Sequence, residues 1–377
     1  MIKKKGKIKN IYNKPKKPDK KALISYIIEP FLIDKNSNRF YRHQNKWQAI
    51  KIVEILNDFG YSVDLFQYDY GNSPKDYEKY DLLFGIDPNF EKFAQNMKKE
   101  VPKIYYATGM HWKQRNKAEK KRIKRFNKRN NASLSTKRKL DKTDSLKLAD
   151  HLIVIGDEYT KKTYTTYEKN IPTYKVRLSS FDFLKPNFDN KDFQKSKKKF
   201  LWFSGGGLIL KGLDLVLETF NELENLELFI CGPTYFEYDF YKTYKDLFKS
   251  NNIKVIGNVN VKSDKFKELT NKCAFIIQPS ASEGTPGSVV TCMHRGLIPL
   301  VTDEVRENLN DWGIKISNAR IKDIKEIIVN ASKMKNKKIK KMASKSSKYA
   351  KNNHTKETFT KDFRNSLKEA LAKTNKK

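Results

Sequence analysis

The chain has 377 residues, of which 38% are hydrophobic and 12% aromatic, and this supply of apolar side chains excludes a wholly disordered protein. The length allows two or three domains of about 100–200 residues each. Lys and Arg total 78 against 43 Asp and Glu, and the net charge of +35 indicates a polyanionic partner or a generally Lys-rich composition.

The first half of the chain predicts an α/β domain of Rossmann type. After a basic tail (1–21), the apolar run 22–28 has the length of a buried strand. Apolar residues at helical spacing follow between Trp47 and Leu56, and the alternating segment 62–68 then completes a βαβ unit with parallel strands. Three further apolar runs predict strands, although no G-x-G-x-x-G signature is present: 82–84, 104–107 and 152–155.

The second half repeats this alternation after a breaker-rich linker, 186–198. Strands are predicted at 199–203, 226–231, 253–256, 274–277 and 298–301. Helices are predicted after Leu213, at 236–248, around Phe266, at 288–296 and at 321–331. Two doubly wound parallel-sheet domains in tandem, 22–185 and 199–333, are therefore expected.

The last segment, 334–377, is strongly basic and nevertheless carries an apolar stripe. Phe359, Phe363, Leu367 and Leu371 recur every four residues, as on one face of a helix. We expect this helix to dock on one of the domains.

Ligands of open parallel sheets bind beyond the carboxyl ends of the strands, where the second domain carries a glycine-rich turn. Gly205, Gly206 and Gly207 follow the strand 199–203, and Lys211 comes four residues later. Glycines let the backbone approach a phosphate, and a lysine supplies a point charge. The alternative is that these glycines serve only the turn.

A second polar segment follows the strand 274–277. Glu283 is placed to accept hydrogen bonds from sugar hydroxyls, and Gly284 follows it. Gly287 and Ser288 open a helix whose free N–H groups would face the crevice. The alternative for Glu283 is a polar residue in a capping turn.

Together the two segments resemble glycosyltransferase family 4, the group 1 glycosyltransferases with the GT-B fold. The family stretch G-R-L-x-x-x-K-G reads 205–212 here, and its S-E-G-x-P stretch reads 282–286, within a similarity that spans about 199–331. The resemblance implies transfer of a sugar from a nucleotide-activated donor held between the domains. It also implies that Lys211 contacts the diphosphate, that Glu283 holds hydroxyls of the donor sugar, and that Gly287 and Ser288 receive the β-phosphate. No metal or other cofactor is expected.

Two positions depart from the family pattern. The family arginine falls on Gly206, and the second glutamate of its E-x7-E motif, which usually holds the ribose, falls on Thr291. His43 and His111 are further catalytic candidates, although each is as readily a polar loop residue. His111 lies two residues beyond the family's cleft histidine, whose position is taken by Gly109.

The segment 113–142 contains 14 Lys and Arg against two acidic residues, a local net charge of +12. It is expected to be either a solvated basic insertion or a contact with an anionic membrane surface. Nucleic acid is an unlikely partner, because only Trp112 and Phe126 supply aromatic rings to this run.

The function that the resemblance implies is a retaining, metal-independent glycosyltransferase that uses a nucleotide sugar and a glycan or lipid-linked acceptor in cell-surface glycan synthesis. A non-catalytic protein that binds a sugar nucleotide or a polyanion is the alternative. Three observations predict a cytoplasmic location: the basic start has no apolar core, long apolar runs are absent, and the three cysteines are unpaired. Peripheral contact with the inner membrane face is a further expectation.

Overall fold

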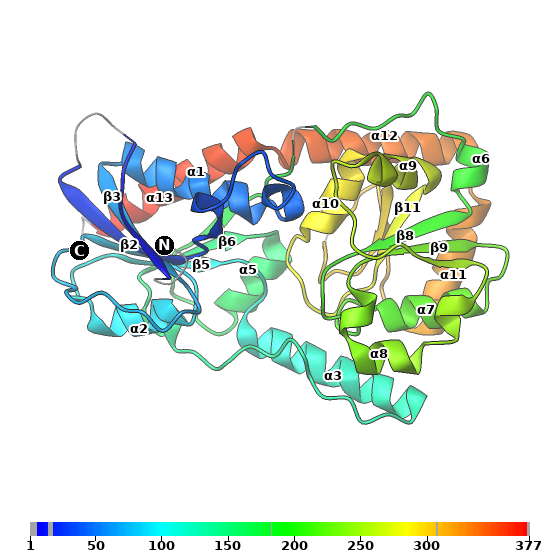
Figure 1. Ribbon diagram of the computed structural model, residues 1–377, viewed down its shortest axis with the longest axis horizontal. Helices are drawn as coiled ribbons and strands as arrows, with labels where there is room; N and C mark the ends of the chain where they lie inside the picture. Colours follow the sequence, from blue (N-terminus) through cyan, green and yellow to red (C-terminus); the bar gives the residue numbers. More distant parts are fainter. Residues whose placement is uncertain (1–5, 14–17, 182, 307, 375–377) are drawn as a thin grey trace.

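The computed structural model describes residues 6–13, 18–181, 183–306 and 308–374. Residues 1–5 and 14–17 of the predicted N-terminal tail, and 375–377 of the predicted C-terminal tail, lie outside the described residues. Two α/β domains lie side by side (Figure 1), each built on its own sheet, with seven strands in the first and six in the second. The predicted fold class, two parallel-sheet domains, is confirmed.

The N-terminal sheet has the order β1-β3-β2-β4-β5-β6-β7, and all its pairs are parallel except β1 with β3. The prediction that 1–21 is only a tail is wrong, because β1 pairs with β3 in register Lys7 to Phe66 and β2 begins at Lys20. The strands are β1 (Lys7–Ile11), β2 (Lys20–Tyr26), β3 (Tyr61–Gln67), β4 (Leu82–Gly85), β5 (Lys103–Ala107), β6 (His151–Ile155) and β7 (Thr173–Val176).

Helices cover both faces of this sheet because alternate strand residues point to opposite faces. In β2, Ala22 and Ile24 pack in a cluster with α1 and α13, whereas Leu23 packs with α2 on the other face. The helices that follow these strands are α1 (Asn45–Asp58), α2 (Asn89–Asn96), α3 (Trp112–Asn130), α4 (Ser145–Leu148) and α5 (Glu158–Thr165).

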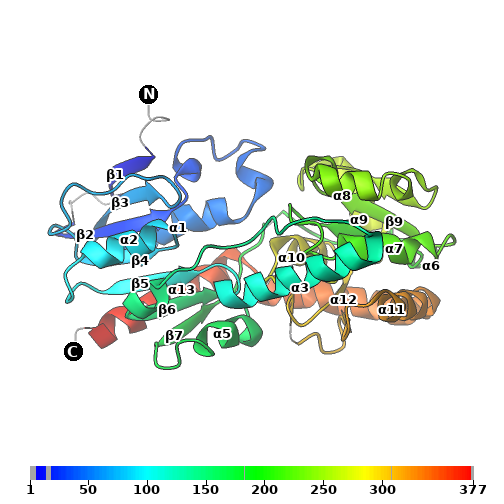
Figure 2. The same ribbon diagram turned by 90° about the horizontal axis from the view of Figure 1, so that it is seen from below.

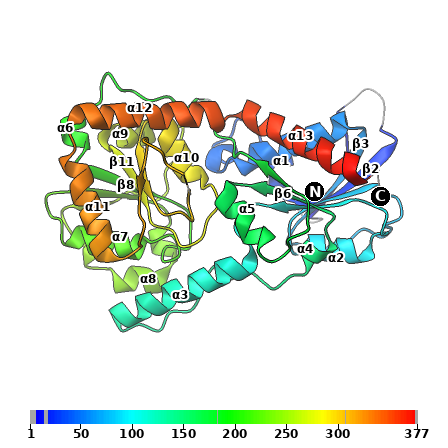
Figure 3. The same ribbon diagram turned by 180° about the vertical axis from the view of Figure 1, so that it is seen from behind.

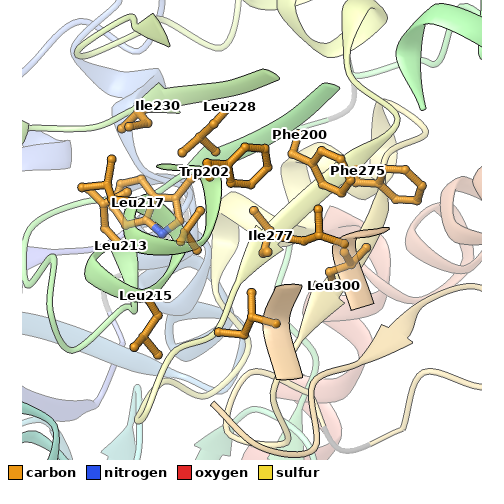
Figure 4. Packing of buried hydrophobic residues seen from close by; sticks show 14 of the residues in the cluster. Phe200, Trp202, Leu213, Leu215, Leu217, Leu228, Ile230, Phe275, Ile277 and Leu300 are labelled. Carbon is orange, nitrogen blue, oxygen red and sulfur yellow. The ribbon is translucent and has the colours of Figure 1, made fainter. Parts of the chain in front are cut away.

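The C-terminal sheet has the order β10-β9-β8-β11-β12-β13 and is parallel throughout. The large buried side chains on one of its faces pack against α7 and α11, and Figure 4 shows part of this cluster around Phe200 and Trp202. The opposite face, which includes Leu201 and Ile276, packs against α9 and α10. The strands are β8 (Lys199–Phe203), β9 (Glu227–Cys231), β10 (Ile253–Val255), β11 (Phe275–Gln278), β12 (Ile298–Val301) and β13 (Ile314–Lys315).

The helix predicted over 236–248 is broken. Short 3-10 turns, Thr234–Phe236 and Leu247–Lys249, flank a six-residue α8, and the linker holds a four-residue α6. The helices of this half are α6 (Phe193–Ser196), α7 (Leu213–Asn221), α8 (Tyr238–Thr243), α9 (Asp264–Lys272), α10 (Gly287–His294), α11 (Ile321–Lys333), α12 (Asn336–Asn353) and α13 (Lys356–Thr374).

The C-terminal segment returns from the second domain to the first. Helix α12 packs on the C-terminal domain through Met342 and Ala350, and α13 places Phe359, Phe363 and Leu367 in the core of the N-terminal domain. Figure 3 shows the two helices running across the back of both domains. The apolar stripe of this basic segment is thus the face that docks.

Helix α3 makes a second crossing between the domains (Figure 2). It starts after β5 of the N-terminal domain, and its residues Ile123 and Phe126 are buried in the core of the C-terminal domain. The expectation of a solvated basic insertion at 113–142 is therefore wrong. Among the described helices, none is long and apolar enough to span a membrane.

Candidate active site

The two predicted motifs meet because β8 and β11 are neighbouring parallel strands, so that their carboxyl ends lie at one edge of the sheet. The loop after β8 and the loop after β11 are joined by a backbone hydrogen bond from Ala281 N to Leu210 O, 2.9 Å. Gly212, at the end of the first loop, has φ +77°, and a Cβ there would lie 2.5 Å from Pro279 O. The close approach of the two loops therefore requires glycine at this position.

Lys211 and Glu283 form an ion pair at this edge. The Nζ of Lys211 lies 2.5 Å from Oε1 of Glu283, and the two side chains are 14% and 16% exposed. Gln278 donates from Nε2 to the same oxygen at 3.3 Å, and Ser288 Oγ donates to Gln278 Oε1. A lysine ammonium has three donors and a carboxylate two acceptor oxygens, so both groups retain capacity for a ligand.

The glycine-rich turn is not the open backbone seat that the sequence predicted. The carboxylate of Glu237 accepts hydrogen bonds from Gly207 N at 2.5 Å and from Leu208 N at 3.2 Å. The N–H groups of Gly207 and Leu208 are therefore already bound to a carboxylate and are not open to a phosphate. Gly205 and Gly206, by contrast, line the cleft beside Lys211. The sequence offered no signal for Glu237, which lies 30 residues beyond Gly207 and follows a 3-10 turn.

The start of α10 faces the N-terminal domain. Gly284, Gly287, Ser288 and Thr291 line the cleft as expected, but the side chain of Gln44 lies directly against Gly287, where a Cβ would overlap its amide. Thr291 is buried, with 4% of its surface exposed. A phosphate at this helix start would therefore share the space with the amide of Gln44.

The two histidine candidates differ in environment. His43 lines the cleft and is exposed to it. Partial loss of hydration of the ring, followed by the positive charges of Lys211 and Lys46, lowers its pKa. Its Nδ1 accepts a hydrogen bond from Asn45 N at 3.2 Å, which leaves Nε2 as the position that can carry the proton of the neutral ring.

His111 is held more tightly. It caps α3, because its Nδ1 accepts from Lys113 N at 3.3 Å, and its ring stacks on Tyr167 with 4.4 Å between the ring centroids. Burial, with a smaller contribution from Lys113, lowers the pKa of His111 to about 4. This environment favours a structural role over the expected catalytic one.

The cleft between the domains has a volume of about 1310 Å³ and contains both motifs. Its walls are held together by contacts between the domains: Met110 N donates to Glu283 O at 3.1 Å, and Asn260 Nδ2 donates to Asn38 Oδ1 at 2.8 Å. Two arginines that the sequence analysis did not single out, Arg115 and Arg138, also line it. Within the described ranges, no group of three His, Cys, Asp or Glu side chains is arranged to hold a metal ion.

Two facing Rossmann-like domains with a cleft between them form the GT-B fold. Residues 185–353 match the family described as "Glycosyl transferases group 1". This C-terminal part of the chain is therefore similar to the group 1 glycosyltransferases.

Solved structures with the same fold cover nearly the whole chain. Anabaena HepE in complex with UDP and glucose is 12% identical with a TM-score of 0.57, over 94% of this chain and 99% of its own. Sucrose-phosphate synthase from Thermosynechococcus elongatus is 10% identical with a TM-score of 0.64, over 93% and 99%. A glycosyltransferase from Rickettsia africae is 13% identical with a TM-score of 0.56, over 94% and 99%. No curated protein sequence matches the chain.

Proposed function

We propose that this protein transfers a sugar from a nucleotide-sugar donor to a glycan or lipid-linked acceptor. The observation that carries the proposal is the ion pair of Lys211 and Glu283, 2.5 Å apart in the cleft between the domains. The complex of HepE with UDP and glucose supports a uridine nucleotide as the first donor to test.

In this reaction the bond between the anomeric carbon and the diphosphate oxygen breaks, and its electron pair leaves with the nucleoside diphosphate. The acceptor oxygen forms the new bond to the anomeric carbon, and its proton passes to the oxygen of the departing diphosphate. Stabilising the departing diphosphate is the main electrostatic task. Lys211 would supply positive charge there, and the free oxygen of Glu283 would accept hydrogen bonds from the donor sugar.

His43 is the histidine we propose to contact the reacting groups, because its ring lines the cleft and Nε2, which carries the proton of the neutral ring, can donate a hydrogen bond there. His111 we propose to act by positioning α3. By family resemblance we propose that the anomeric configuration is retained and that no metal takes part.

We propose that the outward face of α3 contacts an anionic membrane surface, where a lipid-linked acceptor would reside. Exposed lysines follow this helix on the side away from the buried Ile123 and Phe126, and each basic residue near such a surface contributes about 1 kcal/mol. These lysines are Lys113, Lys117, Lys120, Lys121, Lys124 and Lys128.

A thermal-shift screen of the purified protein against nucleotide sugars and DNA tests the proposal. A ligand that binds the native state at 100 times its Kd stabilises it by about 2.7 kcal/mol. We expect stabilisation by one nucleotide sugar, weakened in Lys211→Ala and Glu283→Ala. Stabilisation by DNA alone would instead support the alternative of a polyanion-binding protein.

A further inference from the structure

The segment that follows α3 returns across the cleft and is held along that helix. We call residues 131–143 the strap. Asn127 exchanges two hydrogen bonds with the backbone of Leu134, and Asn116 exchanges two with the backbone of Leu140. The strap therefore runs antiparallel to α3 at a fixed register.

Between these two attachments, a buried carboxylate holds the middle of the strap. Oε1 of Glu119, in a residue that is only 2% exposed, accepts hydrogen bonds from Lys137 N at 2.9 Å and Arg138 N at 2.7 Å. Charge-assisted hydrogen bonds of this kind are among the stronger ones in proteins. They determine the position of the Arg138 backbone.

Helix α3 is in turn anchored to the C-terminal domain, which carries both motifs. Arg129 binds Asp214 at 2.6 Å and Glu218 at 3.0 Å, both on α7. Arg122 donates to the carbonyl of Pro279 at 2.9 Å, directly before the loop that contains Glu283. The strap is thereby positioned relative to the loops after β8 and β11, and not to the N-terminal domain alone.

This anchoring brings the side chain of Arg138 over the glycine-rich turn. A Cβ at Gly207 would lie 2.8 Å from Cγ of Arg138 and 3.6 Å from its Nε, so the turn leaves room for this side chain only because position 207 is glycine. Arg115 lies beside it and donates from Nε to the carbonyl of Arg138 at 3.0 Å. Both arginines line the cleft together with Lys211.

The groups around the turn differ in whether their charges are already paired. Lys211 is paired with Glu283, and the N–H groups of Gly207 and Leu208 are bound by Glu237. No carboxylate of the described residues forms an ion pair with Arg138. The pKa of Arg115 is lowered, first by burial and then by the positive charge of Arg138. An anion between the two guanidinium groups would remove this repulsion.

We propose that Arg138, with Arg115 beside it, binds the diphosphate of the nucleotide, supplying from the strap the cation that position 206 lacks. Gly206 has no side chain to offer, whereas a guanidinium presents paired donors that match a phosphate. This inference rests on the proposed function and assigns part of the donor site to a segment outside the C-terminal domain.

Calorimetric titration with UDP and with inorganic pyrophosphate tests the inference, because pyrophosphate reports on the diphosphate site whatever the base. The variants are Arg138→Gln, Arg138→Lys, Lys211→Ala and, as a matched control, Arg125→Gln. Arg125 is an exposed arginine of α3 that does not line the cleft, so its loss removes one positive charge from the same basic segment, 113–142. We expect Arg138→Gln to raise the Kd of both probes roughly tenfold or more.

The expected results for Arg125→Gln and Arg138→Lys complete the comparison with Arg138→Gln. Arg125→Gln should change the Kd less than about twofold because an exposed, distant charge is screened. Arg138→Lys should restore part of the affinity, since lysine keeps the charge and loses the paired donors.

Two results would overturn the inference, and they differ in what else they overturn. If Arg138→Gln binds as tightly as Arg125→Gln while Lys211→Ala is weakened, the inference is wrong and the proposed function stands. If the unaltered protein binds neither pyrophosphate nor UDP, GDP or ADP, the proposed function is wrong and the inference with it. Unfolding curves of each variant confirm that exposed Arg138 can be replaced without loss of the fold.

Discussion

The docking of α3 on the C-terminal domain is tested by Phe126→Ala. Phe126 is fully buried and packs against Phe240 and Tyr244, with ring centroids 6.2 Å and 5.8 Å away. Replacing a buried phenylalanine with alanine removes its burial and leaves a cavity, which costs about 3–5 kcal/mol. For a unit of 150–250 residues this lowers Tm by roughly 6–20 °C.

The matched control is Phe236→Ala, which removes the same atoms from a side chain that is 81% exposed. Its free energy of unfolding should change by no more than about 0.5 kcal/mol. Circular dichroism with urea and heat measures both variants. Limited digestion with trypsin adds a local readout, because α3 carries many lysines and its release would expose them.

Two outcomes agree with the docked helix: a lower stability of the whole C-terminal domain, or faster tryptic cleavage within α3 as the helix detaches. Equal unfolding curves and equal cleavage rates for Phe126→Ala and Phe236→Ala would refute the reasoning. The basic segment would then be an appendage, as the sequence first indicated.

Three further predictions follow from individual side chains. Thr291 offers one hydroxyl in place of a carboxylate, so it should hold the ribose only weakly. In competition assays, UDP should bind between about one and three times as tightly as its 2′-deoxy form, both in the unaltered protein and in Thr291→Ala. A preference of about tenfold or more would mean that another residue holds the ribose. The pKa of His111 is lowered from 6.5 to about 4, so the unfolded state binds more protons in this interval and stability should fall as the pH drops through it. Buried His354 acts in the same direction, so the test is the difference from His111→Gln, whose pH dependence over this window should be weaker; identical profiles would contradict the assignment. Charge reversal of three lysines on α3, Lys120→Glu, Lys124→Glu and Lys128→Glu, should abolish co-sedimentation with anionic liposomes at low salt. The same reversal at three exposed lysines elsewhere, Lys195, Lys249 and Lys267, should not abolish it. Equal losses in the two triple variants would mean that only the net charge matters.

The sequence predicted those parts of the site that depend on local order along the chain. The loops after β8 and β11 follow short apolar runs, and strands that are parallel neighbours must bring Lys211 and Glu283 to one edge. The apolar stripe of Phe359, Phe363 and Leu367 likewise predicted a docked helix, because burial of such a face stabilises it.

The parts that sequence analysis missed depend on contacts between distant residues. Glu237 and Arg138 reach the glycine-rich turn from other segments, and no periodicity or motif marks either of them. In the basic segment, only Ile123 and Phe126 are apolar and buried among many lysines and arginines, which is too weak a pattern to predict a packed helix. Strand β1 was hidden for the same reason, since Lys7–Ile11 alternates poorly and gains its pairing from β3.

The most direct test of the proposed transfer is turnover. The purified protein is incubated with each of several nucleotide sugars, UDP-glucose first, and release of the nucleoside diphosphate is followed with and without a glycan or lipid-linked acceptor. We expect release from one donor that is faster with acceptor. Release should be lost in both Lys211→Ala and Glu283→Ala, while the exposed control Arg125→Gln stays active. Release that is unchanged by the loss of Lys211 and Glu283, or no release from any donor, would contradict it.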